Sequence, residues 1–183
     1  MAVVTTPAIK AHLNIAGDTH DTELGQFVAA AEAVIAKRCG PLEPTAVTER
    51  VPGCGSSLVL TRLPVISLTS VTPVGGSAVS LSDLYLDTRT GMVRWAAGSA
   101  GFAGDWYDVA YSAGRTTCPP DLVLAIKELV RHMWQTQRGP SSRPGSTAAS
   151  EIANTLPGAA YTFPIRVEQV VSLHELTRVG GFA

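Results

Sequence analysis

The sequence is poor in charged and aromatic residues, and it has no long apolar run. Only 16% of its 183 residues are charged, and 14 basic residues against 15 acidic ones give a net charge of −1. This balance excludes the broad positive surface with which proteins grip nucleic acid through its phosphates. No segment approaches the roughly 20 consecutive apolar residues that span a bilayer. The sequence therefore predicts no membrane partner.

Cysteine is scarce as well. Cys39, Cys54 and Cys118 are odd in number and widely spaced, so they do not form a disulfide framework. This favours a reducing compartment such as a cytoplasm, and the first residues do not have the pattern of a secretory signal. The four histidines are far apart in the sequence, and no metal-binding spacing occurs. We expect no metal and no cofactor.

Signals for nucleophilic catalysis are missing too. There is no Gly-x-Ser-x-Gly segment, and the Gly-rich stretches lack the Lys-Ser/Thr of a phosphate-binding loop. Pro52-Gly-Cys54-Gly-Ser-Ser57 is the nearest Gly-rich segment around a nucleophile, and we interpret it as a turn between two strands. An enzyme centred on Cys54 remains an alternative from another functional class, but we predict no catalytic residue and no enzyme.

Three segments have the caps and periodicity of helices. Thr6-Pro7 is typical of a helix start, which predicts a short helix over 6–13. A second helix is predicted over 21–38 and a third over about 119–138, each with one apolar face. The expected helix-packing core consists of apolar residues of the two longer helices: Leu24, Phe27, Val28, Ala31, Ile35, Leu122, Ile126, Leu129, Val130, Met133 and Trp134.

Between these helices, residues 46–112 favour antiparallel strands, because short runs rich in β-branched residues are cut by Gly and Pro. The expected strands lie in the runs Ser57–Leu60, Val65–Val74, Val79–Leu86, Gly91–Trp95 and Trp106–Tyr111. Asp87-Thr-Arg-Thr-Gly91 is the clearest hairpin turn. The aromatic residues of this region are assigned to core or subunit packing.

The C-terminal part begins with a segment of Gly, Pro, Ser, Thr and Ala over 139–160, which is typical of a linker. Apolar residues resume after it: Tyr161, Phe163, Ile165, Val167, Val170, Val171, Leu173 and Leu176. One interpretation is that residues 161–183 fold back on their own domain. The other is an arm that docks on a partner and becomes ordered there. Periodicity does not decide between helix and extended strand.

The order of these elements resembles that of a known family. The sequence has the helix Thr6-Pro-Ala-Ile-Lys-Ala-His-Leu13 and then Leu24-x-x-Phe27-Val-Ala-Ala-Ala-Glu-Ala-Val-Ile35 with Cys39-Gly-Pro. Later come Val109-Ala-Tyr-Ser-Ala-Gly114, Cys118-Pro-Pro-Asp-Leu and the long helix that ends at Trp134-Gln-Thr-Gln-Arg138. In this order, over residues 6–40 and 105–138, the chain resembles the head–tail connector (adaptor) proteins of long-tailed bacteriophages.

The resemblance implies an α+β fold: a small bundle of three main helices with an antiparallel β insertion and an extended C-terminal arm. We expect a connector domain over 1–138 (helical frame 6–40 and 118–138, β region 46–112), a linker over 139–160 and a docking arm over 161–183. The β region over 46–112 and the linker over 139–160 are longer than the corresponding parts of the family pattern. That leaves open which segment meets which neighbour.

By the same resemblance, the subunit forms a homo-oligomeric ring, commonly a dodecamer, under the portal protein at the capsid vertex. It extends the DNA channel and joins the head to a stopper or tail-terminator protein in the virion neck, after assembly in the host cytoplasm. Double-stranded DNA passes through without sequence-specific binding. Alternatives are another neck protein (a stopper or tail-completion protein) and a small DNA-binding module that uses helix 119–138, with Lys127, Arg131 and Arg138 as a thin basic face.

Overall fold

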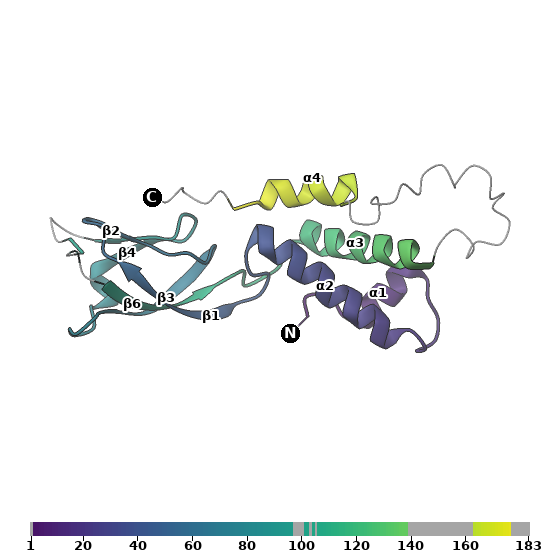
Figure 1. Ribbon diagram of the computed structural model, residues 1–183, viewed down its shortest axis with the longest axis horizontal. Coiled ribbons are helices and arrows are strands. Elements are labelled where there is room, and N and C mark those ends of the chain that lie inside the picture. The colour runs from purple at the N-terminus through teal and green to yellow at the C-terminus, as the bar shows by residue number, and fades with distance from the viewer. Residues whose placement is uncertain (1, 97–100, 103, 105, 139–162, 177–183) are drawn as a thin grey trace. The chain divides into compact units, whose positions relative to one another are not determined.

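The computed structural model describes residues 2–96, 101–102, 104, 106–138 and 163–176. They form four α-helices and two antiparallel sheets of three strands each (Figure 1). The predicted α+β class is thereby confirmed. The chain divides into two compact units: a helical unit of Met1–Ile35 and Pro119–His174, and a β unit of Ala36–Cys118 and Glu175–Ala183. The predicted linker over 139–160 lies outside the described residues.

The helices begin and end near the positions that the sequence predicts. Their bounds are α1 Thr6–Leu13, α2 Asp21–Cys39, α3 Pro120–Arg138 and α4 Ile165–His174. Acidic Asp21 and Glu23 lie in the first turn of α2, and basic Lys37 and Arg38 lie in its last turn, where each charge opposes the helix dipole. The C-terminal segment, for which periodicity left helix and strand open, is helical over α4.

The core of the helical unit is made by one face of each long helix. On α2 the buried residues are spaced at helical intervals: Leu24, Val28, Ala31 and Ile35. On α3 the buried members of the expected core are Leu122, Ile126, Leu129 and Val130. The three largest expected core residues, Phe27, Met133 and Trp134, are half-buried.

Polar contacts fix the segment between α1 and α2. Lys10 Nζ lies 2.6 Å from Asp18 Oδ1 and 2.9 Å from Asp21 Oδ1. Hydrogen bonds to Asp18 and Asp21 raise the pKa of Lys10. The ring of His20, just before α2, meets Trp134 of α3 edge-on, with ring centroids 5.2 Å apart. These contacts set the direction in which the chain enters α2.

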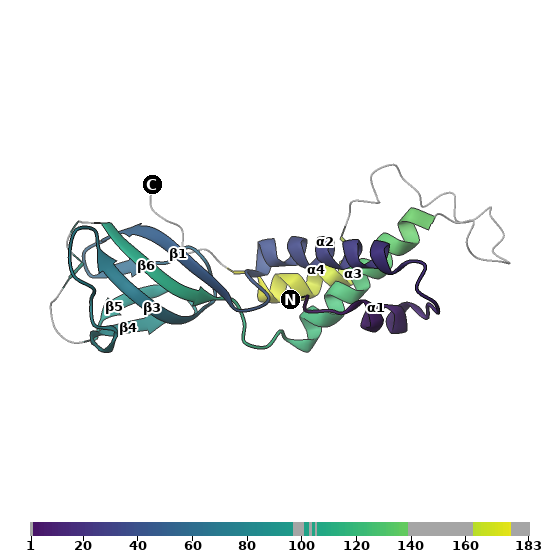
Figure 2. The same cartoon turned by 90° about the horizontal axis from the view of Figure 1, so that it is seen from below.

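The β unit contains two small sheets. One has the order β1-β6-β3 and the other the order β2-β5-β4, and all pairings are antiparallel (Figure 2). Their bounds are β1 Thr45–Pro52, β2 Ser57–Val59, β3 Val65–Pro73, β4 Leu84–Asp87, β5 Met92–Trp95 and β6 Trp106–Ala113. Strand β6 lies in the centre of its sheet and β5 in the centre of the other.

Two parts of the strand prediction are corrected. Strand β1 was not among the predicted runs, because inward-facing Val47 and Val51 are separated by the charged Glu49. The predicted strand Val79–Leu86 begins only at Leu84, because residues 81–83 form a short 3₁₀ helix. Its turn closes by a hydrogen bond from the Asp83 N–H to the Ser80 carbonyl over 3.2 Å, and the Ser80 and Ser82 hydroxyls lie 2.8 Å apart. Such local bonds of serine compete with strand pairing.

The predicted hairpin at Asp87–Gly91 joins β4 to β5, as expected. Asp87 Oδ1 accepts hydrogen bonds from the backbone N–H groups of Arg89 (3.0 Å) and Thr90 (3.3 Å). Hydrogen bonding within this turn lowers the pKa of Asp87. Gly91 has φ +69°, a conformation that favours glycine.

The two sheets pack face to face around one shared core. The core residues come from both sheets and from the segments that connect them: Val51, Leu58, Leu60, Leu63, Val65, Val71, Val93, Phe102, Tyr107, Val109, Tyr111 and Ala113. Along β6 the buried and less buried residues alternate, as a strand with one covered face requires. The outer faces of the two sheets therefore point in opposite directions.

Candidate docking surfaces

The C-terminal apolar segment contains both buried and exposed side chains. On α4, Val167 and Val171 are 1% and 0% exposed, whereas Ile165 and Leu173 are 77% and 80% exposed. The buried valines lie in the helical unit, where α4 packs on α3. In this conformation Val167 and Val171 are not available to a partner, and Ile165 and Leu173 are. Tyr161 lies outside the described residues.

The other members of the expected docking arm are half-buried. Phe163 precedes α4, and Val170 lies between its buried and exposed faces. Leu176, two residues beyond α4, packs against the core of the β unit. The exposed apolar surface of α4 is therefore narrow. It lies on one side of the helix, because Ile165 and Leu173, eight residues apart, project at roughly 80° from each other around its axis.

An ion pair joins the C-terminal end of α4 to the N-terminal end of α3. His174 Nε2 lies 2.6 Å from Asp121 Oδ2. The hydrogen bond from His174 lowers the pKa of Asp121, and burial acts in the opposite direction. The pair shows that α3 and α4 run antiparallel to each other. It also places the carboxylate of Asp121 in the first turn of α3, where the helix dipole favours a negative charge.

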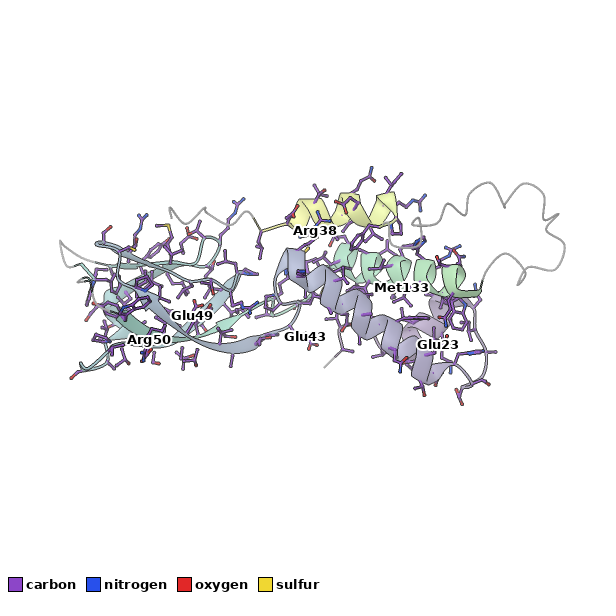
Figure 3. All side chains as sticks on the ribbon, in the orientation of Figure 1. Glu23, Arg38, Glu43, Glu49, Arg50 and Met133 are labelled. Carbon is purple, nitrogen blue, oxygen red and sulfur yellow. The ribbon has the colours of Figure 1, made fainter. Side chains whose placement is uncertain are left out.

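Beyond α4 the chain contacts the start of the β unit. The guanidinium of Arg38, labelled in Figure 3, donates to both carboxylate oxygens of Glu175, over 3.4 and 3.2 Å. The Leu176 N–H donates to the Arg38 carbonyl over 3.4 Å. Gly40 lies directly beside this contact with φ +77°. A Cβ there would lie 2.0 Å from the Leu63 carbonyl oxygen and 2.7 Å from Leu176 Cδ1.

The outer face of sheet β1-β6-β3 has a polar centre and an apolar end. In the centre, Arg50 (labelled in Figure 3) donates to both oxygens of Asp108 over 2.7 and 3.0 Å. Hydrogen bonding between the two raises the pKa of Arg50 and lowers that of Asp108. At the end, Trp106 pairs with exposed Pro52 and its carbonyl accepts from the Val74 N–H. Trp106 is 53% exposed and Val74 49%. We call Pro52, Val74 and Trp106 the tryptophan face.

The outer face of sheet β2-β5-β4 has a different composition. Arg94 lies in register with Ser57 on one side and Tyr85 on the other, and residues paired in this way share a face. Tyr85 is 61% exposed and the nearby Val59 41%. The guanidinium of Arg94 lies 3.8 Å from Met92 Sδ. We call Val59, Tyr85 and Arg94 the arginine face.

The strand pattern of the sequence predicts the same role, core or subunit packing, for Trp95, Trp106, Tyr107 and Tyr111. The structure separates them. Tyr107 and Tyr111 are buried, Trp95 is half-buried, and Trp106 is exposed. The signal that separates them is present in the sequence, because Tyr107, Val109 and Tyr111 alternate and so leave Trp106 on the opposite side of the strand. Tyr85 and Arg94 lack such a signal, since their strands have only four residues each.

The segment around Cys54 forms a tight turn. The N–H groups of Cys54 and Ser57 donate to each other's carbonyls over 3.2 and 3.3 Å, and Gly55 has φ +62°. Of the predicted basic face on α3, Arg131 is exposed and Lys127 is half-buried, and the side chain of Arg138 is not among those described. No group of three His, Cys, Asp or Glu side chains able to hold a metal ion occurs among the described residues. In the same part of the chain, no helix is both long and apolar enough to cross a membrane.

Comparison with known proteins identifies relatives by family and by fold. A search of curated proteins finds no match. Among solved structures, the chain is similar to one in the neck of an empty gene transfer agent particle, computed with C6 symmetry. The two share 18% identity and a TM-score of 0.65 over 98% of this chain and 93% of that one. A chain in the neck of the native gene transfer agent particle, computed with C12 symmetry, gives 19% identity and a TM-score of 0.62, with 100% and 96% covered.

The family model of the head completion protein matches residues 2–175. This match includes all four helices and both sheets. It confirms, at the level of family, the resemblance to connectors between head and tail that the order of the helices indicates. The chain belongs to the head completion protein family.

Proposed function

We propose that this chain is the subunit of a head–tail connector ring, which lies under the portal and joins the head of a phage-like particle to its tail or stopper. The observation that carries the proposal is the family match over residues 2–175. The similarity of fold at nearly full length to chains in particle necks supports the position in the neck. Such a role needs binding surfaces and no catalysis, so we infer a structural protein.

The copy number that we propose is twelve. One of the neck structures with this fold was computed with C12 symmetry. In a ring, every contact between subunit and neighbour is repeated around the axis, so that modest contacts together give a durable joint. Among the described residues, the exposed large apolar side chains are distributed over α2, α3, α4 and the β unit, which fits such an arrangement.

We propose that the exposed side of α4, with Ile165 and Leu173, docks on the portal. Two large apolar side chains with about four fifths of their surface in solvent gain free energy when a partner covers them. The buried Val167 and Val171 hold α4 on α3, so the docking element is a helix already formed before binding. A preformed element loses less conformational entropy on binding than a disordered tail.

On the side away from the portal we propose a stopper or tail-terminator protein as neighbour, with double-stranded DNA passing through the ring. A net charge of −1 suits a channel that must release its DNA, because phosphate binding depends on basic residues. The basic face of Lys127, Arg131 and Arg138, of which Lys127 is half-buried, is too small a set for a DNA-binding groove helix. The alternative of a DNA-binding module is therefore less well supported.

Sedimentation velocity of the purified chain with the portal protein of the same particle tests the proposal. We expect several copies of the chain to sediment with each portal, independently of DNA. The double variant Ile165→Asp/Leu173→Asp should bind at least ten times more weakly. Leu124→Asp, which changes an exposed leucine of α3 (53% exposed), is the matched control and should bind normally.

Two outcomes contradict the proposal. If the chain does not associate with the portal but binds a preformed connector ring, it is a stopper or tail-completion protein. If instead it binds duplex DNA with an affinity that falls steeply with salt, the DNA-binding alternative is correct. Equal binding by the wild type and the α4 double variant would remove α4 from the docking surface while leaving the connector role intact.

A further inference from the structure

The β unit has exposed apolar and aromatic side chains on two opposite sides. The tryptophan face lies on the outside of sheet β1-β6-β3, and the arginine face lies on the outside of sheet β2-β5-β4. Because the inner faces of both sheets share one core, the two outer faces point away from each other. A rigid unit with different surfaces on opposite sides has the geometry that a head-to-tail contact between identical copies requires.

The tryptophan face is an unusual feature for a solvent-facing strand. Trp106 lies at the end of the central strand β6, held by pairing with β1 and β3, so its position is fixed. Trp106 is 53% exposed, and its carbonyl accepts a hydrogen bond from the N–H of Val74, which is 49% exposed. Aromatic side chains held rigidly at a surface are typical anchors of protein interfaces, since they bury a large area at little entropic cost.

The charges of the two faces favour one pairing. Arg50, the cation on the outer side of the tryptophan-face sheet, is already held by both oxygens of Asp108. If two tryptophan faces packed on each other, their apolar groups would meet, but neither face would bring a cation free to bind the other. Arg94 has no carboxylate partner among the described residues, and its contact there is with Met92 Sδ. An arginine of this kind is attracted to the face of an indole ring.

We propose that the tryptophan face of one copy packs on the arginine face of the next, with the Arg94 guanidinium stacked on the Trp106 indole. This inference rests on the proposed ring and names the surface through which its subunits contact each other. Tyr85 and Val59 add aromatic and aliphatic area around Arg94, opposite Val74 and Pro52. A head-to-tail contact forms a ring when the rotation that relates neighbouring copies adds up to a full turn after a whole number of copies.

The test uses full-length chains bound to the portal, with the number of chains per portal measured by sedimentation velocity at a fixed chain concentration. Trp106→Glu disrupts the tryptophan face and leaves the arginine face intact. Arg94→Glu disrupts the arginine face and leaves the tryptophan face intact. Each variant alone has no intact lateral contact and should bind at least ten times more weakly than the wild type. In an equal mixture of the two variants, the intact arginine face of Trp106→Glu can pack on the intact tryptophan face of Arg94→Glu. The mixture should therefore bind more tightly than either variant.

Controls separate this interface from misfolding and from general charge effects. Arg89→Glu makes the same change of charge in the β4–β5 turn, off the proposed face, and should bind like the wild type. Trp106→Phe keeps an aromatic ring and should retain most of the binding. Thermal unfolding of each variant checks that the β unit is folded.

The outcomes distinguish this inference from the proposed function. If the wild-type chain fails to bind the portal, the connector function fails and this interface with it. If the wild type binds and Trp106→Glu and Arg94→Glu bind equally well, the ring uses another surface and the connector role stands. If both variants are weak and their mixture is no better than either, the two faces do not contact each other, and the pairing is overturned.

Discussion

The hydroxyl of Tyr111 donates a hydrogen bond to Glu49 Oε1 over 3.0 Å and accepts one from the Arg62 N–H over 3.0 Å. The same oxygen of Glu49 accepts from the Thr61 N–H over 2.8 Å, and the Thr61 hydroxyl bonds the other oxygen. Glu49 lies on the inner side of β1, where a carboxylate without partners would destabilise the sheet. Glu49 accepts three hydrogen bonds, two from Thr61 and one from a tyrosine 62 residues away, so this network joins β1, β6 and the segment after β2.

Replacing Tyr111 with Phe should destabilise the β unit. The substitution keeps the ring but removes a donor to Glu49 and an acceptor for the Arg62 N–H, and we expect a loss of about 1–3 kcal/mol in the free energy of unfolding. Urea denaturation measures this loss. Tyr85→Phe, at a tyrosine that is 61% exposed, is the matched control with an expected change near zero. Equal stability of the two variants would show that the network contributes nothing.

The same tyrosine predicts a loss of stability at alkaline pH. Burial is the largest cause that raises the pKa of Tyr111 from 10.0 to about 12. Because the folded pKa is the higher one, the neutral phenol stabilises the fold below pH 10. That contribution is lost as the pH rises from about 10 to about 12. We expect the free energy of unfolding to fall by about 2 kcal/mol over this range, in excess of the fall in Tyr111→Phe. If the free energy of unfolding fell equally with pH in the wild type and in Tyr111→Phe, the alkaline loss of stability would not come from Tyr111.

The sequence predicts the helices better than the sheets, and the reason is physical. The starts of α1, α2 and α3 are marked by a proline or by acidic residues in the first turn, which are local in the sequence. By contrast, β1 depends on Glu49, whose inward position is stabilised by Tyr111 on β6. No periodicity shows such a pairing. The hairpin at Asp87–Gly91 was predictable because its bonds lie within the turn itself.

For the docking surfaces the sequence indicates the segment but not its exposed side. The apolar residues of α4 lie on both sides of the helix, so the pattern does not tell which of Val171 and Leu173 packs on α3. The contact depends on the surface of α3, which lies more than 30 residues earlier. The arginine face depends on the registration of three short strands, and only the structure gives that.

The two sides of α4 should respond differently to truncation. Val171 is fully buried and Leu173 is 80% exposed. Val171→Ala leaves a cavity in the helical unit and should cost about 1–3 kcal/mol in the free energy of unfolding. Leu173→Ala removes more atoms but should change that free energy by less than about 0.5 kcal/mol. Chemical denaturation measures both. A larger cost at Leu173 would mean that α4 packs with its other side on α3.

The ion pair between His174 and Asp121 should stabilise the last turn of α4. Asp121→Asn removes the charge, and because the pair is largely exposed we expect a cost below about 1 kcal/mol. The clearer readout is hydrogen exchange of the last amides of α4, which should become faster. The pKa of Asp121 is lowered from 3.8 by the hydrogen bond from His174. The contribution is therefore present above pH 4 and disappears as the pH falls through the lowered value.

The matched control for this pair is Asp83→Asn, an exposed aspartate in the β unit, which should leave exchange in α4 unchanged. At a pH below the lowered pKa of Asp121, the wild type and Asp121→Asn should exchange at the same rate, because protonation of Asp121 does the same as the substitution. A difference that persists at this pH would show that the substitution acts through the N-terminus of α3 and not through the pair.

Gly40 should be the glycine at which a side chain is least tolerated around the end of α2. A Cβ at this position would lie 2.0 Å from the Leu63 carbonyl oxygen, which is backbone and cannot move aside, and φ is +77°. Gly40→Ala should therefore cost about 3 kcal/mol or more in the free energy of unfolding. Gly17→Ala is the control, since Gly17 has φ +85° but nothing within 4 Å of its Cβ position.

Comparing the two glycines separates backbone conformation from crowding. Both substitutions place alanine in the left-handed region, which costs about 1–2 kcal/mol, so that part of the effect is common to both. The additional loss of unfolding free energy in Gly40→Ala measures the close approach of the Leu63 backbone. It also measures how firmly the chain beyond α4 is held, because Leu176 Cδ1 would lie 2.7 Å from the new Cβ. Hydrogen exchange at the Leu176 amide should also become faster in Gly40→Ala. If Gly40→Ala and Gly17→Ala lowered the free energy of unfolding equally, the backbone around Leu63 would have to move aside without loss of stability. The contact with Leu176 would then not hold residues 175–176 in place.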